Sequence, residues 1–394
     1  MIPVWMLFLK TKNRIDLKEL SFEEFHSVTQ YCSKVLKEEE IFEMISSWVN
    51  DHQQSRTQKY FDQLVQYVNF QRIDARYLSD KVVTNQYVTN SAVCLRQIVS
   101  QKLKLPAVGE RLLLLGGLDV ETSAVKYFQD SWQKCADSLK PIRRSAVASN
   151  ATHVFVVDGS QRKGHIIQVY DVDRDTWSIT KNILKTPRCG ATATIVYNNL
   201  YIFAGCDGHT SLSSTEAFVI SGASILPCGP YEGLPDLKVA RWNHASVSRN
   251  GEVYFIGGAS SGNILSSFES IDASYTARST ELPSLIQARM GLSAVLYDSD
   301  LIAVGGYNSE GVLKNPVESY SFDIKQWTLM EPLMVEPRWG HCSAVYRGQI
   351  LVVGGRNGDD DSVYDIEVYD PETKLWKIHS ALGRSRYYSS LLVL

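Results

Sequence analysis

The chain has 394 residues, of which 44% are hydrophobic and 21% are charged, a composition that suits about two globular domains with apolar cores. Its formal net charge of −3 gives no broad basic surface, so we expect neither a nucleic acid nor a membrane among its partners. The seven cysteines never stand in C-x-x-C spacing. This argues against a disulfide framework or a zinc site and indicates a cytoplasmic location.

The N-terminal segment, residues 1–19, stays unassigned. Its apolar run of nine residues, MIPVWMLFL, is too short to span a bilayer, and it has neither the basic flank nor the cleavage site of a secretory signal. We interpret it as a segment that packs locally.

Apolar residues recur with helical spacing over residues 20–101. Ser21 and Glu24 have the S-x-x-E spacing of a capping box, in which two side chains satisfy the free amides at a helix start. Five apolar residues then follow at a spacing that places them on one face of a helix: Ile41, Phe42, Ile45, Trp48 and Val49. We predict an all-α domain of four or more helices over residues 20–101, followed by a proline- and glycine-containing linker at 102–110.

Residues 111–394 contain an internal repeat. An arginine precedes a Gly-Gly or small-Gly pair by 16 residues in four copies, which start at Arg188, Arg241, Arg289 and Arg338. A looser copy starts at Arg143 or Arg144, and another Gly-Gly pair stands at residues 116–117. Each unit contains four short strand-like segments. A repeat of about 40–50 residues with four strands predicts an all-β, six-bladed propeller.

Two further patterns concern the packing and the closure of this propeller. In three units a tyrosine is followed seven residues later by a tryptophan, and we expect the pairs to fill the space between neighbouring sheets: Tyr170–Trp177, Tyr320–Trp327 and Tyr369–Trp376. The first unit lacks an arginine strand, whereas the C-terminal segment RSRYYSSLLVL is an arginine strand with no glycine pair after it. We therefore predict that the C-terminal strand closes blade one.

The arginine strand, double glycine, tyrosine and spaced tryptophan resemble the kelch repeat over residues 111–394. The helical part is similar to the BACK domain of kelch-like proteins at these positions: Glu40, Phe42, Trp48, Val49, Arg56, Leu64, Tyr77 and Leu78. In that family a BTB domain dimerises and, with the first BACK helices, holds cullin-3, while the propeller captures the protein to be ubiquitinated. The resemblance implies a substrate-recognition adaptor of a cullin-3 RING ubiquitin ligase, which is not itself an enzyme.

The resemblance has one gap and leaves one alternative open. Only residues 1–19 precede the BACK-like stretch, so we expect this chain to lack the BTB domain that supplies dimerisation and cullin-3 contact in the family. The alternative is a kelch scaffold that binds actin and has no ligase role. A propeller hydrolase or oxidase ranks below both, because the sequence has no catalytic motif and no metal-ligand spacing. We expect no cofactor.

The candidate binding residues lie at one mouth of the propeller channel. Propeller symmetry should place the arginines of the innermost strands in a positive ring suited to carboxylates: Arg144, Arg188, Arg241, Arg289, Arg338 and Arg386. The equally weighted alternative is that each arginine bonds loop carbonyls and braces its own blade. The loops after the glycine pairs differ between blades and add further candidates: Asp207, His209, Tyr307, Asn308, Arg356 and Asn357. His244 and His341 occupy equivalent repeat positions and are expected to be structural.

Overall fold

The computed structural model divides into two compact units, residues 1–109 and residues 110–394. In the first unit it describes residues 20–33, 36–50, 58–68, 70, 73, 77–82, 85–89, 91, 94 and 98. In the second unit it describes residues 111–394 apart from 119, 129–130, 151, 160–164, 197, 229–233, 250, 274–278, 313–316, 332–333 and 372. The unassigned N-terminal segment and the predicted linker at 102–110 lie outside the described residues.

The first unit is described as a set of helices and helical turns. They are α2 (Phe22–Cys32), α3 (Glu38–Asn50), α4 (Gln58–Leu64), the 3-10 turn η2 (Val65–Tyr67), the π-helical turn η3 (Leu78–Val82) and α6 (Gln86–Thr89). The predicted capping box precedes α2: the Ser21 N–H donates to Glu24 Oε2 at 3.0 Å, and the Glu24 N–H donates to Ser21 Oγ at 3.3 Å. The carboxylate and the hydroxyl thus satisfy two amides that the helix start leaves free.

The core of this unit lies on the face of α3 that the apolar spacing predicted, and all five of those side chains are buried. Trp48 stacks on Phe25 of α2 with ring centroids 4.4 Å apart, and it meets Tyr60 of α4 edge-on at 6.4 Å. One tryptophan therefore holds three helices together through aromatic contacts. Within the described part of the chain, no helix is long and apolar enough to cross a membrane.

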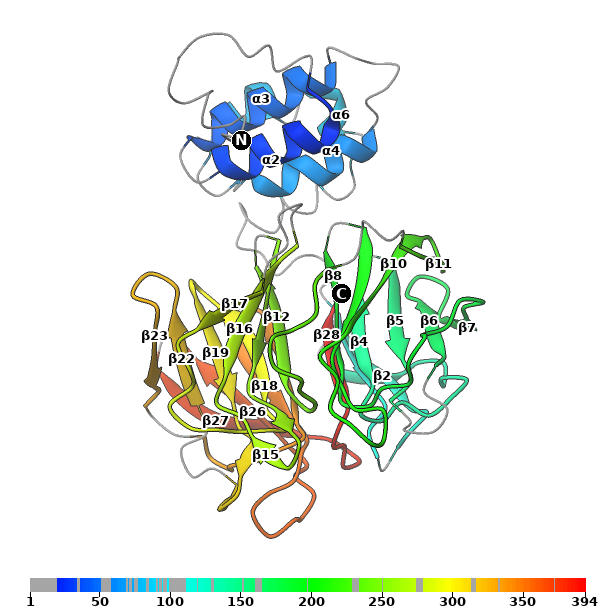
Figure 1. Ribbon diagram of the computed structural model, residues 1–394, viewed down its shortest axis with the longest axis vertical. Helices are drawn as coiled ribbons and strands as arrows, with labels where there is room; N and C mark the ends of the chain where they lie inside the picture. Colours follow the sequence, from blue (N-terminus) through cyan, green and yellow to red (C-terminus); the bar gives the residue numbers. More distant parts are fainter. Residues whose placement is uncertain are drawn as a thin grey trace. The chain divides into compact units, whose positions relative to one another are not determined.

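The second unit is a ring of six four-stranded antiparallel sheets, the blades of a propeller (Figure 1). Blade one consists of β28 (Ser390–Val393), β1 (Leu112–Leu115), β2 (Ala124–Phe128) and β3 (Ser131–Lys134). Blade two consists of β4 (Ala146–Ser149), β5 (His153–Val157), β6 (Ile167–Asp171) and β7 (Thr176–Ile179). Blade three consists of β8 (Thr192–Val196), β9 (Asn199–Phe203), β10 (Thr215–Ser221) and β11 (Ser224–Pro227).

The second half of the ring has the same plan. Blade four consists of β12 (Ala245–Arg249), β13 (Glu252–Ile256), β16 (Phe268–Asp272) and β17 (Ser279–Leu282). Blade five consists of β18 (Ser293–Tyr297), β19 (Asp300–Val304), β22 (Val317–Ser321) and β23 (Gln326–Leu329). Blade six consists of β24 (Cys342–Tyr346), β25 (Gln349–Val353), β26 (Asp365–Asp370) and β27 (Leu375–Ala381). Two small hairpins add β14 (Ala259–Ser260) with β15 (Asn263–Ile264), and β20 (Tyr307–Asn308) with β21 (Gly311–Val312). The predicted six-bladed propeller is confirmed.

The ends of this unit meet in blade one, as the sequence predicted. Strand β28 pairs with β1 over four residues, from Leu112 opposite Val393 to Leu115 opposite Ser390. Beyond the strands, Arg111 and Leu394 exchange both backbone hydrogen bonds. The C-terminal strand thereby covers a sheet edge that would otherwise be open.

The three Tyr-Trp pairs belong to hydrophobic clusters that join neighbouring blades, as predicted. Each of the three Tyr-Trp pairs lies directly across the third and fourth strands of its blade, with ring centroids 5.0 to 5.3 Å apart. Blade one has a fourth pair, Tyr127 and Trp132, at 5.2 Å. The seven-residue spacing missed this pair because the turn between β2 and β3 is shorter than in the other three blades.

The first strand of every blade lines the central channel, since β4, β8, β12, β18, β24 and β28 form a succession of neighbouring strands. Each first strand begins at the end of the channel where the second strand of its blade finishes in the glycine pair; Ala245, for example, lies opposite Ile256. The loops after the glycine pairs therefore share one face with the loops that lead into the first strands. We call this the mouth face; the hairpin of β14 and β15 lies on it, at the bottom of Figure 1.

Closure by β28 makes a deletion test possible. Removing residues 384–394 should abolish the cooperative thermal unfolding of the propeller, because blade one would lose its innermost strand and blade six its neighbour. Circular dichroism melting would measure this, with Ser390→Ala as the control, since it keeps every backbone bond of β28. A cooperative transition near that of the full chain would contradict the prediction.

Candidate binding surface at the propeller mouth

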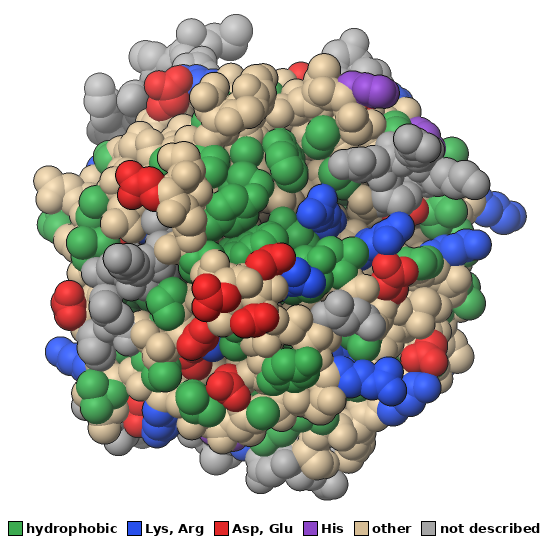
Figure 2. Space-filling model, turned by 90° about the horizontal axis from the view of Figure 1, so that it is seen from below, with side chains coloured by type: hydrophobic (Ala, Val, Ile, Leu, Met, Phe, Trp, Pro, Cys, Tyr) green, Lys and Arg blue, Asp and Glu red, His purple; other side chains and the backbone are tan. Residues whose placement is uncertain are grey.

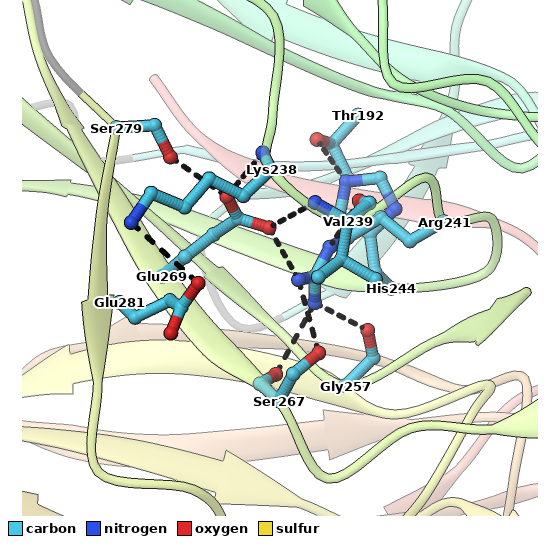
Figure 3. A network of polar contacts seen from close by, with 10 residues as sticks. All are labelled: Thr192, Lys238, Val239, Arg241, His244, Gly257, Ser267, Glu269, Ser279 and Glu281. Atoms are coloured by element: carbon cyan, nitrogen blue, oxygen red, sulfur yellow. Dashed lines mark hydrogen bonds and ion pairs between the residues drawn. The ribbon is translucent and has the colours of Figure 1, made fainter.

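In five of the six blades a buried arginine connects separate segments of the blade, and blade four shows the arrangement (Figure 3). Arg241 Nη1 donates to the carbonyl oxygens of Gly257 at 2.8 Å and Ser267 at 3.2 Å. Its Nη2 donates to Ser267 Oγ at 3.1 Å and to Glu269 Oε1. The guanidinium thus connects the loop before the first strand with the end of the second strand and the start of the third.

The glutamate is as fully engaged as the arginine. Besides the guanidinium, the Glu269 carboxylate accepts the N–H groups of Lys238 at 2.8 Å and Val239 at 3.3 Å, both in the loop that enters the blade. The ion pair and the two loop amides on its carboxylate recur in three other blades, as the pairs Arg188–Glu216, Arg289–Glu318 and Arg338–Glu367. Burial lowers the pKa of each of these arginines, and the glutamate opposes that shift.

The expected ring of exposed arginines is wrong for five of its six members. Arg188 is 1% exposed, Arg386 is 4% exposed, and the other three are completely buried: Arg241, Arg289 and Arg338. Their guanidinium groups turn into the blades, where backbone carbonyls and, in four blades, a carboxylate satisfy them. The bracing alternative describes these five residues.

Blade two departs from this plan, and neither Arg143 nor Arg144 takes the bracing position. Ile142 occupies the bracing position of blade two. Its carbonyl oxygen accepts the Gly117 N–H, just as the carbonyl oxygen of the bracing residue Arg289 accepts the Gly258 N–H. The third strand of this blade has Gln168 in place of the glutamate, and its amide bonds the Lys140 backbone at 2.8 and 3.1 Å. Blade two has therefore lost both charges of the pair together.

The six residues that stand two positions after each bracing position form a ring around the channel mouth, and five backbone hydrogen bonds connect them in succession. The Gly190 N–H donates to the Arg144 carbonyl at 3.1 Å, and four further bonds of 2.6 to 2.9 Å continue from blade to blade through Asn243, Gly291, Gly340 and Tyr388. All six residues have positive φ, between 50° and 66°. This backbone conformation suits glycine and strains most other residues.

The three members of the ring that are not glycine meet across the mouth. The Arg144 guanidinium lies 4.5 Å from the ring centroid of Tyr388. The Asn243 side-chain amide donates to the Tyr388 hydroxyl at 2.9 Å, and this bond joins opposite blades, one and four. Burial raises the pKa of Tyr388 to about 12, so the phenol is neutral at physiological pH. These three side chains line a recess of about 160 Å³.

Aromatic side chains extend this site toward blades five and six. Trp339 contacts Tyr307, Tyr388 and Tyr387, with ring centroids 4.9, 5.7 and 6.2 Å apart. Arg356 lies over the Tyr387 ring at 4.1 Å. Figure 2 views the mouth face: hydrophobic side chains gather in its hollowed centre, with basic side chains on one side and acidic ones on another. The face therefore combines apolar rings, cations and hydrogen-bonding groups.

The loop residues predicted for binding separate into two groups. Tyr307 and Arg356 belong to the aromatic site, although Arg356 also pairs with Asp360 at 2.7 Å. The others shape or occupy their own loops: Asp207 accepts the N–H groups of His209 and Thr210, Asn308 accepts that of Glu310, and Asn357 accepts those of Asp359 and Asp361. His209 is exposed at the tip of its loop.

Four residues of the site were not predicted from the sequence: Asn243, Trp339, Tyr387 and Tyr388. A signal for two of them was present, since the position two residues after the bracing arginine is glycine at Gly190, Gly291 and Gly340 but not at Asn243 and Tyr388. A large side chain at a position where the repeat otherwise has glycine indicates a special role.

The two equivalent histidines connect neighbouring blades. His244 Nε2 lies 2.9 Å from Thr192 Oγ1, and His341 Nε2 lies 2.9 Å from Ser293 Oγ. Burial, with a bracing arginine nearby, lowers the pKa of His341 to about 3 and that of His244 well below its ordinary value. Both are neutral structural groups. Across the described residues, no three potential ligands are grouped as a metal site would need.

The neutral residues of blade two, Ile142 and Gln168, suggest substitutions that test how much a buried arginine–glutamate pair contributes to stability. Arg241→Ile should lower the free energy of unfolding by about 3–5 kcal/mol, because it leaves the buried Glu269 without a counter-charge. Adding Glu269→Gln, which reproduces Ile142 with Gln168, should recover about 1 kcal/mol or more of that loss. Urea unfolding of the single and double variants would measure the coupling. Additive losses would contradict it.

Because His341 is buried and neutral, we predict that the free energy of unfolding decreases in acid. The pKa of His341 is near 3 in the fold and 6.5 as the ordinary value, so the unfolded chain binds more protons and stability falls as pH drops from 6.5 toward 3. His341→Gln should remove about 2 kcal/mol of the stability lost between pH 7.5 and pH 5. Urea unfolding at both pH values would measure this, and exposed His379→Gln is the control. Equal acid sensitivity in the His341 variant and the parent chain would contradict it.

Two family models match the chain. The BACK model, described as "BTB And C-terminal Kelch", matches residues 7–83, and the Kelch motif matches residues 187–222 and 337–378. The BACK match begins inside the segment left unassigned above and ends earlier than the predicted boundary at 101.

Curated relatives match across both units. The chain is 25% identical to Kelch-like protein 7 of Rattus norvegicus over 81% of this chain and 56% of that protein. It is 23% identical to Kelch-like protein 41a of Danio rerio over 74% of this chain and 54% of that protein. Beta-scruin of Limulus polyphemus is 29% identical over 42% of this chain and 19% of its own length. The chain thus spans about half the length of the kelch-like relatives it matches.

A solved structure supports the fold alone. It is described as "Structure of YjhT" and aligns with a TM-score of 0.56 at 13% identity, over 69% of this chain and 95% of that chain. The chain therefore matches the BACK model in its first unit and the Kelch motif in its second unit, which is a six-bladed propeller, and it is similar to kelch-like proteins.

Proposed function

We propose that this protein is a cytoplasmic substrate-recognition adaptor of a cullin-3 RING ubiquitin ligase, and that its propeller binds the target protein at the mouth face. The observation that carries the proposal is the convergence of Arg144, Asn243 and Tyr388 in a ring where glycine would be easiest to accommodate.

Backbone strain is the first support. Each non-glycine residue with positive φ costs on the order of 1–3 kcal/mol, and such residues cluster at functional sites. Here the cost occurs at three positions whose side chains contact one another and open onto one recess. A purely structural ring would be built more cheaply from six glycines.

The chemistry of the mouth favours a polypeptide as ligand. Half-exposed Trp339, Tyr307 and Tyr387 offer apolar area at low cost in conformational entropy, and the Arg144 guanidinium offers charged donors. Such aromatic and arginine groups form the energetic centres of protein interfaces. A loop of a target protein that presents an apolar side chain and an acceptor oxygen would match this surface.

The comparisons support the ligase part of the proposal. The BACK match and the kelch-like relatives connect the chain with the family in which a propeller serves as the substrate-binding part of a larger complex. In such a complex, ubiquitin transfer belongs to other subunits, so this chain would be non-catalytic. Since the chain spans about half of its relatives' length, contact with cullin-3 is itself part of what the experiment must test.

Because the ring residues have positive φ, their side chains can be removed by substitution with glycine without straining the backbone. A triple variant, Arg144→Gly, Asn243→Gly and Tyr388→Gly, should fold with a stability within about 1 kcal/mol per site of the parent, because glycine suits each φ. Affinity capture from cells should then lose the target protein and retain cullin-3 if the adaptor engages it.

The control is Arg143→Ala, which removes the neighbouring exposed arginine that pairs with Glu121. It should return the same proteins as the parent chain. Identical captures from the folded triple variant and the parent would overturn the mouth as the binding site. Absence of cullin-3 from every capture would overturn the ligase role of this chain.

An actin-binding kelch scaffold without a ligase role is the second candidate, and the match to Beta-scruin favours it. Co-sedimentation with filamentous actin separates the two functions. Sedimentation of the parent chain with filaments, together with captures that contain actin and no cullin-3, would replace the adaptor proposal with the scaffold.

A further inference from the structure

Blade one has the arginine and the two loop amides that bind the buried glutamate in four other blades, but it has no glutamate. Four blades place a carboxylate against the bracing arginine and two loop amides, such as those of Val335 and Glu336 around Glu367. The matching amides of blade one belong to Gly383 and Arg384, and the matching arginine is Arg386. The glutamate position, two residues after the serine that bonds the arginine, holds Val125.

The space that a glutamate would fill is open. Val125, Gly383, Arg384 and Arg386 all line one cavity of about 840 Å³ between strands β2 and β3 and the loop 382–386. In the part of the chain that the structure describes, neither loop amide has a hydrogen-bond partner, and space beside Gly383 is empty to 4 Å. Gly383, Arg384 and Arg386, whose counterparts hold a carboxylate in four other blades, therefore all line one cavity.

The charge of Arg386 is uncompensated in a way that no other blade repeats. Its guanidinium bonds neutral groups only: the Gly116 carbonyl at 2.8 Å, the Ser123 carbonyl at 3.2 Å and the Ser123 hydroxyl at 2.9 Å. Burial lowers its pKa, the Cys342 thiol opposes that shift, and a second cation, Arg384, adds to it. Blade two, by contrast, lost arginine and glutamate together.

The other charged groups around the cavity largely satisfy one another. Lys134 pairs with Asp137 at 3.0 Å, and Glu121 pairs with Arg143 at 2.9 Å. Arg384 has no ion pair among the described residues, which leaves two arginines to give the cavity a positive character. Its apolar walls, which include Trp132 and Leu382, suit the methylene groups of an acidic side chain.

We propose that this cavity, the blade-one cradle, is a carboxylate-binding site in which a carboxylate from outside the chain takes the place of the missing glutamate. The carboxylate would bridge the Arg386 guanidinium and the N–H groups of Gly383 and Arg384. Its source is either a small free carboxylate or an acidic side chain of a bound polypeptide. The site stands apart from the ligase role and from the mouth residues, so failure of either proposal leaves the other intact.

Backbone-amide NMR of the full chain tests the proposal directly. The chain would be titrated in chloride-free buffer with sodium acetate, with the capped peptide acetyl-Gly-Glu-Gly-amide, and with the matched Gly-Gln-Gly peptide. The Gly383 and Arg384 amide protons should move downfield and saturate with a carboxylate but not with the glutamine peptide. Acetate and peptide together would indicate a general carboxylate site, and the peptide alone would indicate an acidic side chain of a polypeptide.

The variant Val125→Glu supplies an internal carboxylate and is the matched control. Its melting temperature should equal or exceed that of the parent, its two amides should resonate downfield from the start, and neither ligand should move them. The proposal is overturned if neither carboxylate gives a saturable shift in the parent chain, if the glutamine peptide acts equally, or if folded Val125→Glu responds like the parent. Should Val125→Glu fail to fold, the parent titrations alone decide.

Discussion

The buried arginine–glutamate pair is the interaction on which the propeller depends. Each pair connects three pieces of chain: the loop that enters a blade and carries the arginine, the end of the second strand of that blade, and the start of its third strand. A buried charge is costly when it is left alone and tolerable when every donor and acceptor is satisfied. The pair therefore favours one register of strands and loops over the alternatives, because a shift in register would leave a buried charge without its partner.

Differences between blades show where this constraint has been relaxed. Blade two replaces both partners with neutral residues, Ile142 and Gln168, and the glutamine keeps the loop contact. Blade one replaces only the glutamate, so Arg386 retains its charge beside a cavity. A blade without either partner has no buried charge to satisfy, whereas a blade with the arginine alone has a buried charge that a ligand could satisfy. That asymmetry is what separates a binding site from a mere variation of the repeat.

Much of the fold followed from the sequence because it rests on periodic signals. The 16-residue step from arginine to glycine pair gave the blades, and the unpaired ends gave the closure through β28. The site followed less well. Symmetry placed the arginines at the correct height, but it could not say whether their side chains turn inward or outward. Glutamates at 28 or 29 residues after each arginine carried that information, since they marked a buried partner: Glu216, Glu269, Glu318 and Glu367.

Bracing and recognition occupy positions only two residues apart, and this separation explains how the propeller can vary at its mouth. Arg338 turns into the blade, while Gly340 and its equivalents in the other blades join the backbone ring around the channel. The ring needs a left-handed backbone but no particular side chain, so glycine satisfies it in three blades and leaves the remaining three free to present other groups. Arg144, Asn243 and Tyr388 use that freedom. The bracing position thus maintains the fold, while the side chain two residues later can differ between blades. In this way a repeat scaffold acquires a specific binding surface.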